Sequence, residues 1–332
     1  MSTRRQDGRP AVLVLRALGL GDALTGLAPL RGIRRCWPGH RLVLAAPAGL
    51  GALLRSRGVV DEVLDTSGLA PLQPQALAAL GIDGTHVAVN LHGRGPQSHR
   101  LMLDTRPERF VAFVHGLVGL DQGPAWDPAE HEVLRWCRLV SSAGGSCGPE
   151  DLLLEGRLLE GPSGPADGAV VVHPGAASGS RRWPVQRWRE VVAALTRTGA
   201  RVAVTGSQQE RALVAAVVDG RPDVLDLSGR LTLEQLVETV SVARLLLCGD
   251  TGVAHVATAV RTPSVLLFGP TPPTEWGPLV DTQLHTVLWH PRPGDAERGD
   301  PHACSPDVRL ERIAVTEVLA AAEQLLSRVA AL

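Results

Sequence analysis

The sequence predicts an α/β fold with two Rossmann-like domains whose parallel sheets face each other across a central cleft. Three observations predict it. Short apolar runs alternate with segments of helical period along the chain, which is the pattern of βα units. The 332 residues, 44% of them hydrophobic, suit two domains better than one. A stretch rich in Gly, Pro and Ser at residues 160–168 separates two series of such units.

The first series predicts an N-terminal domain over residues 1–160. Its apolar runs predict five strands: Ala11–Leu15, Arg41–Ala45, Val59–Leu64, His86–Leu91 and Phe110–Val114. Segments of helical period predict helices over Asp22–Cys36 and Glu130–Ser142. Residues 161–168 then form the predicted linker.

The second series predicts a C-terminal domain over residues 169–314. Its apolar runs predict strands over Ala169–His173, Arg201–Thr205, Val224–Leu227, Leu245–Cys248 and Ser264–Phe268. The predicted helices between these strands are Val185–Thr198, Gln208–Val218 and Leu233–Val240. An amphipathic segment from Val315 to Val329 predicts a last helix within residues 315–332, which would pack back toward the N-terminal domain.

Charge and cysteine usage exclude several classes of function. The net charge is -1 and the charges are mixed evenly, without the basic stripe of a nucleic-acid-binding protein. The five cysteines are odd in number and show no C-x-x-C spacing: Cys36, Cys137, Cys147, Cys248 and Cys304. They indicate free thiols in a reducing compartment, with no zinc site and no disulfide framework.

The apolar segments are too short for a signal peptide or a membrane span. The first run, Ala11–Leu15, is interrupted by Arg16, and no stretch approaches about 18 apolar residues. We therefore expect a cytoplasmic protein, in contact at most with the inner face of the membrane, and a monomer.

The first strand leads into a turn that contains Gly19, Gly21 and Asp22. The glycines allow a tight turn, and Asp22 opens the next helix. Asp22 has two interpretations: a helix N-cap, or a carboxylate that the positive helix end keeps ionised and able to accept a proton. The glycine spacing, including Gly26, does not match G-x-G-x-x-G, and the second strand runs into Ala46–Gly49 without an acid for a ribose. A nicotinamide cofactor is therefore not indicated.

The first strand of the second domain ends in a loop of small residues that runs from His173 to Pro184 and contains Arg181 and Arg182. Such a loop suits a diphosphate, because arginine supplies planar, permanently charged donors. The alternative is a flexible loop whose arginines lie in solvent. We interpret His173 as a packing residue at the strand end.

The strand Leu245–Cys248 ends in a second candidate anion site. Thr251 and Gly252 would begin a helix whose free amides face a ligand, and His255 would lie one turn later on the same side as Thr251. We expect Asp250 to accept hydrogen bonds or cap the helix, and His255 to contact phosphate or ribose. The next apolar run ends similarly, in Gly269–Pro272.

The loop from Asn90 to Arg100 carries several polar groups near a strand end. It is equally consistent with an acceptor pocket and with a solvated loop. The sequence lacks H-E-x-x-H, G-x-S-x-G and Walker A motifs, paired carboxylates, and the Asp-x-Asp cluster that would hold a nucleotide-bound Mg²⁺. No metal site is expected.

Together these segments resemble family 9 glycosyltransferases, the heptosyltransferase family of bacterial lipopolysaccharide synthesis. The resemblance covers most of the chain. It is carried by LRALGLGDALTGLAPLRGIRRCWPGHRLVL at the N-terminus, followed by HPGAASGSRRWPVQRW, VAVTGSQQERAL, LSGRLTLEQL, CGDTGVAHVATAV and FGPTPPTEWGP. The family implies a GT-B fold and inverting, metal-independent transfer from a nucleotide sugar held mainly by the C-terminal domain, with no further cofactor.

The resemblance also implies roles for individual residues. Asp22 is the expected base, and Arg181 the cation on the diphosphate leaving group, where many relatives have lysine. The expected donor-binding residues are Ala176, Ala177, Arg181, Glu210, Leu231, Asp250, Thr251, Gly252 and His255. The expected acceptor-binding residues are Gly21, His92, Arg94, Gln97 and Arg100.

The expected function is therefore an inverting glycosyltransferase that uses a nucleotide sugar, with ADP-heptose as the candidate donor. The acceptor is a glycolipid, a polysaccharide or a specialised metabolite. Two alternatives stay open: a sugar-nucleotide epimerase of the same fold, which consumes donor without acceptor, and a nucleotide-sugar sensor, which binds without turnover.

Overall fold

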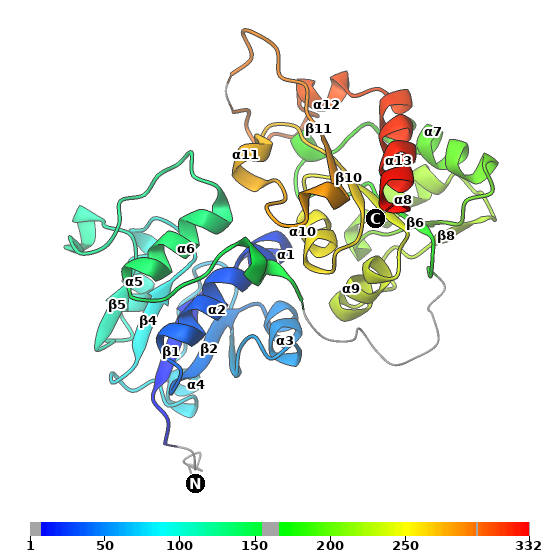
Figure 1. Ribbon diagram of the computed structural model, residues 1–332. Coiled ribbons are helices and arrows are strands. Elements are labelled where there is room, and N and C mark those ends of the chain that lie inside the picture. The colour runs from blue at the N-terminus through cyan, green and yellow to red at the C-terminus, as the bar shows by residue number, and fades with distance from the viewer. Residues whose placement is uncertain (1–7, 155–165, 297, 332) are drawn as a thin grey trace. The chain divides into compact units, whose positions relative to one another are not determined.

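Figure 1 shows the computed structural model of the chain, which describes residues 8–154, 166–296 and 298–331. The chain divides into two compact units, Met1–Leu152 and Leu153–Leu332. The predicted linker, residues 161–168, lies mostly outside the described residues. Each unit is an α/β structure with a parallel sheet, as the sequence predicts.

The sheet of the first unit has five parallel strands in the order β3-β2-β1-β4-β5. The strands are β1 (Ala11–Leu15), β2 (Arg41–Ala46), β3 (Glu62–Asp65), β4 (Val87–Asn90) and β5 (Arg109–Val111). β1 lies in the centre, in register with β2 through pairs such as Leu13 with Val43. All five residues of β1 are buried, because helices cover both faces of the sheet.

The helices of the first unit are α1 (Leu20–Thr25), α2 (Leu27–Cys36), α3 (Ala48–Ser56), α4 (Pro74–Ala79), α5 (Gln97–Leu103) and α6 (Glu132–Ser142). Leu77 of α4 and Met102 of α5 pack with Leu13 and Leu15 of β1 on one face of the sheet. α2 packs against α6. Short 3-10 turns, η1 (Gly116–Val118) and η2 (Pro149–Leu152), lie in the connections.

The sequence predicts one helix over Asp22–Cys36, and the structure has two, α1 and α2, which separate at Gly26. Pro29 has no N–H to donate to the carbonyl of Thr25, so the hydrogen-bond ladder is interrupted there. The side chain of Arg16 also lies against Gly26, where a Cβ atom would be 2.8 Å from Arg16 Cδ. The break is therefore local chemistry that helical periodicity alone does not reveal.

The sheet of the second unit has six parallel strands in the order β11-β10-β9-β6-β7-β8. The strands are β6 (Val170–His173), β7 (Val202–Val204), β8 (Val224–Asp226), β9 (Leu245–Gly249), β10 (Ser264–Leu267) and β11 (His285–Leu288). The sequence predicts the first five and misses β11, because His285 and Thr286 leave it only two apolar residues and hence no apolar run.

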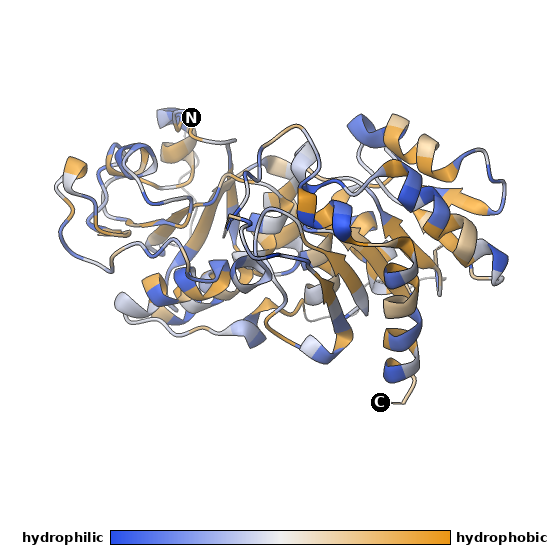
Figure 2. Cartoon of the chain, turned by 90° about the horizontal axis from the view of Figure 1, so that it is seen from above, coloured by the Kyte–Doolittle hydropathy of each residue, from blue (hydrophilic) through white to orange (hydrophobic). Residues whose placement is uncertain are grey.

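The helices of the second unit are α7 (Val185–Arg197), α8 (Arg211–Val218), α9 (Leu233–Ser241), α10 (Gly252–Ala259), α11 (Pro273–Trp276), α12 (Val308–Arg312) and α13 (Val315–Val329). The 3-10 turns η3 (Gly179–Arg181), η4 (Gln208–Glu210) and η5 (Thr282–Leu284) connect them. Trp183 and Trp188 lie in the core with rings 4.9 Å apart. Figure 2 shows that the strands of both units are largely hydrophobic, as sheets covered on both faces require.

The C-terminal helix α13 forms as predicted. The sequence predicts that it packs toward the N-terminal domain; in the structure its buried residues, among them Val318 and Leu325, lie in the core of the second unit. There α13 contacts α7, β10 and β11.

The strand orders place one switch point in each sheet. In the first unit the chain moves outward from β1 to β3 and then returns to the other side of β1 with β4. In the second unit it moves from β6 to β8 and returns beside β6 with β9. Ligands of open α/β sheets bind beyond the carboxyl ends of the strands at such a point. No helix among the described residues is long and apolar enough to cross a membrane.

Candidate active site

Asp22 lies beyond the carboxyl end of β1, at the switch point of the first sheet. The N-cap of α1 is Gly19, so Asp22 is in the first turn of the helix and does not cap it. Gly19 has φ -79° and ψ -178°, an extended conformation open to any residue, so the predicted need for glycine in this turn is not found. The side chain of Asp22 is 28% exposed and remains accessible to a ligand. Gly21, also half-buried, precedes it.

The buried side chain of Arg16 supports this turn, and the sequence alone does not reveal that contact. Arg16 is only 2% exposed. Its guanidinium donates to the backbone carbonyls of Asp22 and Leu91. Nη2 donates to Thr25 Oγ1 at 2.9 Å and to Glu132 Oε1 at 3.1 Å, and it lies 3.8 Å from Asp22 Oδ1.

Glu132, at the start of α6, completes this buried network. Its carboxylate accepts from Arg135 Nη1 at 2.6 Å and from Trp136 Nε1 at 2.6 Å, besides Arg16. Burial opposes the ionised form of Glu132, but Arg16, Trp136 and Arg135 hold its pKa below the ordinary value. Glu132 is therefore a buried anion balanced by two arginines.

The surroundings of Asp22 make its carboxylate more basic than that of an ordinary aspartate. Burial raises the pKa of Asp22 above its ordinary value, the charge of Arg16 opposes this, and Glu132 adds to it. A carboxylate with a raised pKa is a better proton acceptor while it stays ionised at neutral pH.

His92 and Asn90 follow β4, the strand beside β1. His92 Nδ1 accepts from the backbone N–H of Ala17 at 3.2 Å. Burial, together with Arg16, lowers the pKa of His92 to about 4, so the imidazole is neutral at pH 7. Asn90 is fully buried and donates to Ser98 Oγ at 2.8 Å and to His99 at 3.0 Å. These contacts of Asn90 and His92 hold the start of the loop after β4 in place.

The other predicted acceptor residues lie on the surface of the same loop and helix. Arg94, Gln97 and Arg100 are exposed, the last two on α5. The structure brings only His92, of the four polar side chains expected to bind acceptor, into the neighbourhood of Arg16 and Asp22.

In the second unit, the loop after β6 is braced by its own arginine and by a distant segment. Arg182 Nε donates to the carbonyl of Ala176 at 2.9 Å, and Ala177 is exposed beside it. The amide of Ser180 donates to the carbonyl of Ala303 at 2.9 Å. The loop is therefore held against residues 299–307 and is not a free solvent loop.

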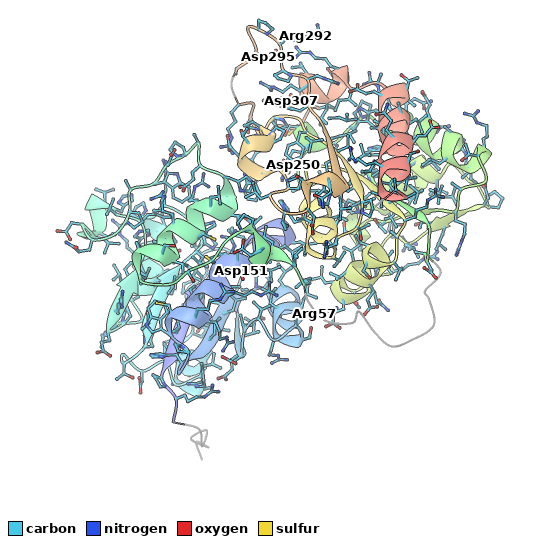
Figure 3. All side chains as sticks on the ribbon, in the orientation of Figure 1. Arg57, Asp151, Asp250, Arg292, Asp295 and Asp307 are labelled. Atoms are coloured by element: carbon cyan, nitrogen blue, oxygen red, sulfur yellow. The ribbon has the colours of Figure 1, made fainter. Side chains whose placement is uncertain are left out.

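Arg181 lies next to Asp250 at the switch point between β6 and β9. The carbonyl of Arg181 packs on the end of β9, where a Cβ atom on Gly249 would be 3.0 Å away. Asp250, labelled in Figure 3, is 5% exposed and lies in the chain between the end of β9 and the start of α10. Burial raises the pKa of Asp250 to about 6, Arg181 and Arg298 oppose this, and Glu275 adds to it. Arg298 Nη1 lies 2.8 Å from Glu275 Oε2.

The start of α10 presents the amides that the sequence predicts. Thr251 is the N-cap and Gly252 the first helical residue, so the first N–H groups of the helix have no acceptor within it. His255 is half-buried, one turn later, with its ring 5.9 Å from that of Trp276. Asp250 precedes the cap and is not the cap itself.

Glu210 already has partners in the free protein. Its Oε2 accepts from the amide and the hydroxyl of Ser207, both at 2.8 Å, in a capping box. Oε1 lies against Gly175 so closely that a Cβ atom there would be 2.0 Å away. Glu210 is thus fixed beside the loop after β6. Leu231 is half-buried and precedes Thr232, the N-cap of α9.

The two sites provide complementary chemistry. The first-unit site holds a carboxylate on a braced turn, and the second-unit site holds helix amides and arginines suited to an anion. Among the described residues no group of three or more His, Cys, Asp and Glu side chains could hold a metal ion.

Comparison with known proteins decides the family. The family model "Glycosyltransferase family 9 (heptosyltransferase)" matches residues 122–303, more than half of the chain. The chain belongs to glycosyltransferase family 9. It is a glycosyltransferase, as the N-terminal and C-terminal motifs predict.

Proteins named as heptosyltransferases resemble it over most of their length. Lipopolysaccharide heptosyltransferase 1 of Salmonella typhimurium is 23% identical over 292 residues, which cover 79% of this chain and 89% of the relative. Among solved structures, E. coli ADP-heptose lps heptosyltransferase II has a TM-score of 0.75 and 18% identity, covering 96% of this chain and 99% of that chain.

A more distant structure is the dodecameric iron-containing heptosyltransferase TibC in complex with ADP-D-beta-D-heptose. It has a TM-score of 0.62 and 15% identity and covers 96% of this chain and 76% of that chain. The structural neighbours share the GT-B fold of heptosyltransferases, which the motifs also imply.

Family 9 motifs do not reveal every group near the two sites. Arg16, Glu132, Glu275 and Arg298 are missed. Arg16 carries one signal in the sequence, a lone charge directly after an apolar strand. Glu132 carries none, because it is 116 positions away from the arginine that it contacts.

Proposed function

We propose that this family 9 member transfers a sugar from a nucleotide-activated donor to an acceptor hydroxyl in a single inverting displacement. The proposal depends on the position of one carboxylate, Asp22, at the switch point of the first sheet, and of Arg181 at that of the second. Asp22 is the base, and Arg181 lies with the donor's diphosphate.

In this reaction Asp22 takes the proton of the acceptor hydroxyl while the oxygen of that hydroxyl attacks the anomeric carbon of the donor sugar. The bond between that carbon and the diphosphate oxygen breaks, and its electron pair leaves with the nucleoside diphosphate. Attack from the side opposite the leaving group inverts the anomeric configuration. The first amides of α10 and the guanidinium of Arg181 stabilise the charge that develops on the leaving group.

The remaining donor residues follow from the second-unit site. We assign Ala176, Ala177, Thr251, Gly252 and His255 to the phosphates and adjoining sugar. Glu210 and Leu231 we assign to the nucleoside, and Asp250 to a hydrogen bond with the donor. For the acceptor we retain Gly21, His92, Arg94, Gln97 and Arg100.

ADP-heptose is the donor that we propose first, because the relatives are named as heptosyltransferases and one neighbour as an ADP-heptose enzyme. The acceptor we propose for a first test is a lipopolysaccharide core glycolipid, from the same names. We further propose that the transfer needs no metal, because Arg181 and Arg298 supply positive charge beside Asp250. Unchanged turnover in EDTA is the expected result, and loss that Mg²⁺ or Fe²⁺ restores would contradict it.

The test of the base is Asp22→Asn, assayed for nucleoside diphosphate release with donor and acceptor together. We expect kcat to fall by about 10²–10⁴-fold while the unfolding midpoint stays near that of wild type. Asp83→Asn, a substitution at an exposed loop carboxylate, is the matched control and should keep full activity. Near wild-type turnover by a folded Asp22→Asn variant would refute the assignment.

The donor is identified by a thermal-shift panel of ADP-, GDP-, UDP- and dTDP-sugars. Binding stabilises the folded protein in proportion to ln(1 + [L]/Kd), so the true donor gives the largest shift at equal concentration. Donor consumed without acceptor would indicate an epimerase, and donor binding with no diphosphate release from any acceptor would indicate a sensor.

A further inference from the structure

The guanidinium of Arg16 connects three segments of the first unit by hydrogen bonds. Each of its three nitrogens donates a hydrogen bond, and the acceptors come from α1, from the residue after β4 and from α6. A guanidinium donates in a fixed planar fork, so these contacts determine where the turn with Asp22 lies. The guanidinium also lies over the ring of Trp136, with Cζ 5.2 Å from the ring centroid, and this contact further restricts the orientation of the guanidinium plane.

The charge of Arg16 is shared between two carboxylates. Nη2 is 3.1 Å from Glu132 Oε1 and 3.8 Å from Asp22 Oδ1. An arginine paired with Asp22 alone in this buried place would strongly favour the ionised carboxylate and make it a weak base. Glu132 makes the shorter contact, and its negative charge repels the Asp22 carboxylate, which offsets part of the attraction of Arg16.

The charges of Arg16 and Glu132 act on Asp22, and Arg135 and His92 interact with these two groups. Arg16 comes from the end of β1, Glu132 and its partner Arg135 from α6, and His92 from the chain after β4. His92 is neutral at pH 7. The remaining charged groups are the cations Arg16 and Arg135 and the anion Glu132, which raises the pKa of Asp22.

We propose that Arg16 and Glu132 form a buried positioning pair for Asp22: Arg16 holds the turn that carries the carboxylate, and Glu132 keeps the positive charge of Arg16 from suppressing its basicity. The pair does not touch substrate. The inference rests on the proposed role of Asp22 as base, but its first claim concerns only the ionisation of Asp22.

The experiment uses the full chain with ¹³C-labelled aspartate carboxyls and follows the Asp22 resonance, assigned with Asp22→Asn, from pH 3 to pH 9. In Glu132→Gln the side chain keeps its shape and loses its charge, so among the described residues Asp22 is the only carboxylate that still pairs with Arg16. We expect the apparent pKa of Asp22 to fall by roughly one unit relative to wild type. Glu130→Gln is the matched control, since Glu130 lies two residues earlier and pairs with Arg138, and it should leave Asp22 unchanged.

The same variants are assayed for the pH dependence of kcat/KM. If the pKa of the acidic limb of kcat/KM falls by the same amount as the pKa read from the carboxyl resonance, both the pair and the base are supported. If the resonance shifts and the limb does not, the pair is supported and Asp22 as base is refuted. If the apparent pKa of Asp22 in folded Glu132→Gln differs from that of wild type by less than about 0.3 unit, the pair is overturned whatever the activity.

Removal of a buried anion can unfold the protein, because it leaves an unpaired guanidinium. Arg16→Lys keeps the positive charge and loses the fork, so it provides the second test. We expect kcat to fall at least tenfold with KM within twofold, because the turn is no longer fixed while the ligand contacts remain. Unchanged kcat in folded Arg16→Lys overturns the positioning role.

Discussion

Arg181 and Asp250 show how neighbouring charges define the second-unit site at the scale of single residues. The sequence suggests both as candidates, and the structure places them together beside Arg298 and Glu275. Arg181 and Arg298 favour the ionised form of Asp250, and Glu275 disfavours it.

Arg181→Ala removes the cation that we assign to the diphosphate. We expect Kd for the nucleoside diphosphate to rise about tenfold or more, because a charge-assisted contact contributes roughly 1.5–3 kcal/mol. Affinity for the acceptor should change by less than twofold. Isothermal titration with each ligand measures both, and Arg197→Ala at the exposed end of α7 is the control. Equal losses for the two ligands would argue against the leaving-group role.

Asp250→Asn should change the pH dependence of stability. Burial raises the pKa of Asp250 to about 6 from 3.8, so the folded state disfavours its ionised form and loses stability as pH rises across that window. The free energy of unfolding of the variant, relative to wild type, should therefore rise by up to about 3 kcal/mol between pH 4 and pH 7 in the unliganded protein.

Urea unfolding at the two pH values measures this difference. Asp83→Asn serves as a contrast, because hydrogen bonds from Thr85 lower the pKa of Asp83 and the trend should reverse in sign. A variant of Asp250 whose relative stability is flat with pH would show that the carboxyl group is not disfavoured in the folded state.

Residues within one motif could be predicted from the sequence, and residues joined across the chain could not. Asp22, Arg181 and Thr251 follow strands that are visible as apolar runs, so their place at the sheet edge follows from the pattern. Glu132 begins a helix that reads as an ordinary amphipathic surface element. Only folding shows that it is buried against Arg16.

At the scale of elements, the loop after β6 depends on the segment that precedes α12. Gly179 lies so close to that segment that a Cβ atom would be 1.7 Å from the carbonyl oxygen of Cys304. Asp307, the N-cap of α12, also donates its amide to the carbonyl of Ser180 at 3.1 Å. The loop and the segment are therefore one structural element, although more than a hundred residues separate them.

Gly179→Ala should force this segment away from the loop. We expect a loss of about 1–3 kcal/mol in stability and weaker binding of nucleoside diphosphate, because overpacking displaces backbone. Denaturant unfolding and titration measure the two effects. Gly39→Ala is the control, since a Cβ atom there would meet nothing within 4 Å. A variant with wild-type stability and affinity would show that this close contact contributes neither to stability nor to binding.

At the scale of the whole molecule, the proposed division of labour assigns donor to the second unit and base to the first. Hydrogen exchange of the full chain with saturating nucleoside diphosphate tests it. We expect slower exchange around residues 174–183 and 250–255, and no change of similar size around residues 16–25. Ligand contacts slow exchange where they order the backbone. Protection strongest in the first unit would reverse the assignment.

The sequence alone determined the α/β class, the approximate positions of nearly all strands along the chain, the family and the motif residues, because apolar runs and strand-end loops are local patterns. Tertiary structure decided the break between α1 and α2, the strand β11, the bracing of the loop after β6 and the pair Arg16–Glu132. Those features depend on burial and on charges brought together across 116 positions of sequence. A side chain's neighbours set its ionisation, and neighbours exist only after folding.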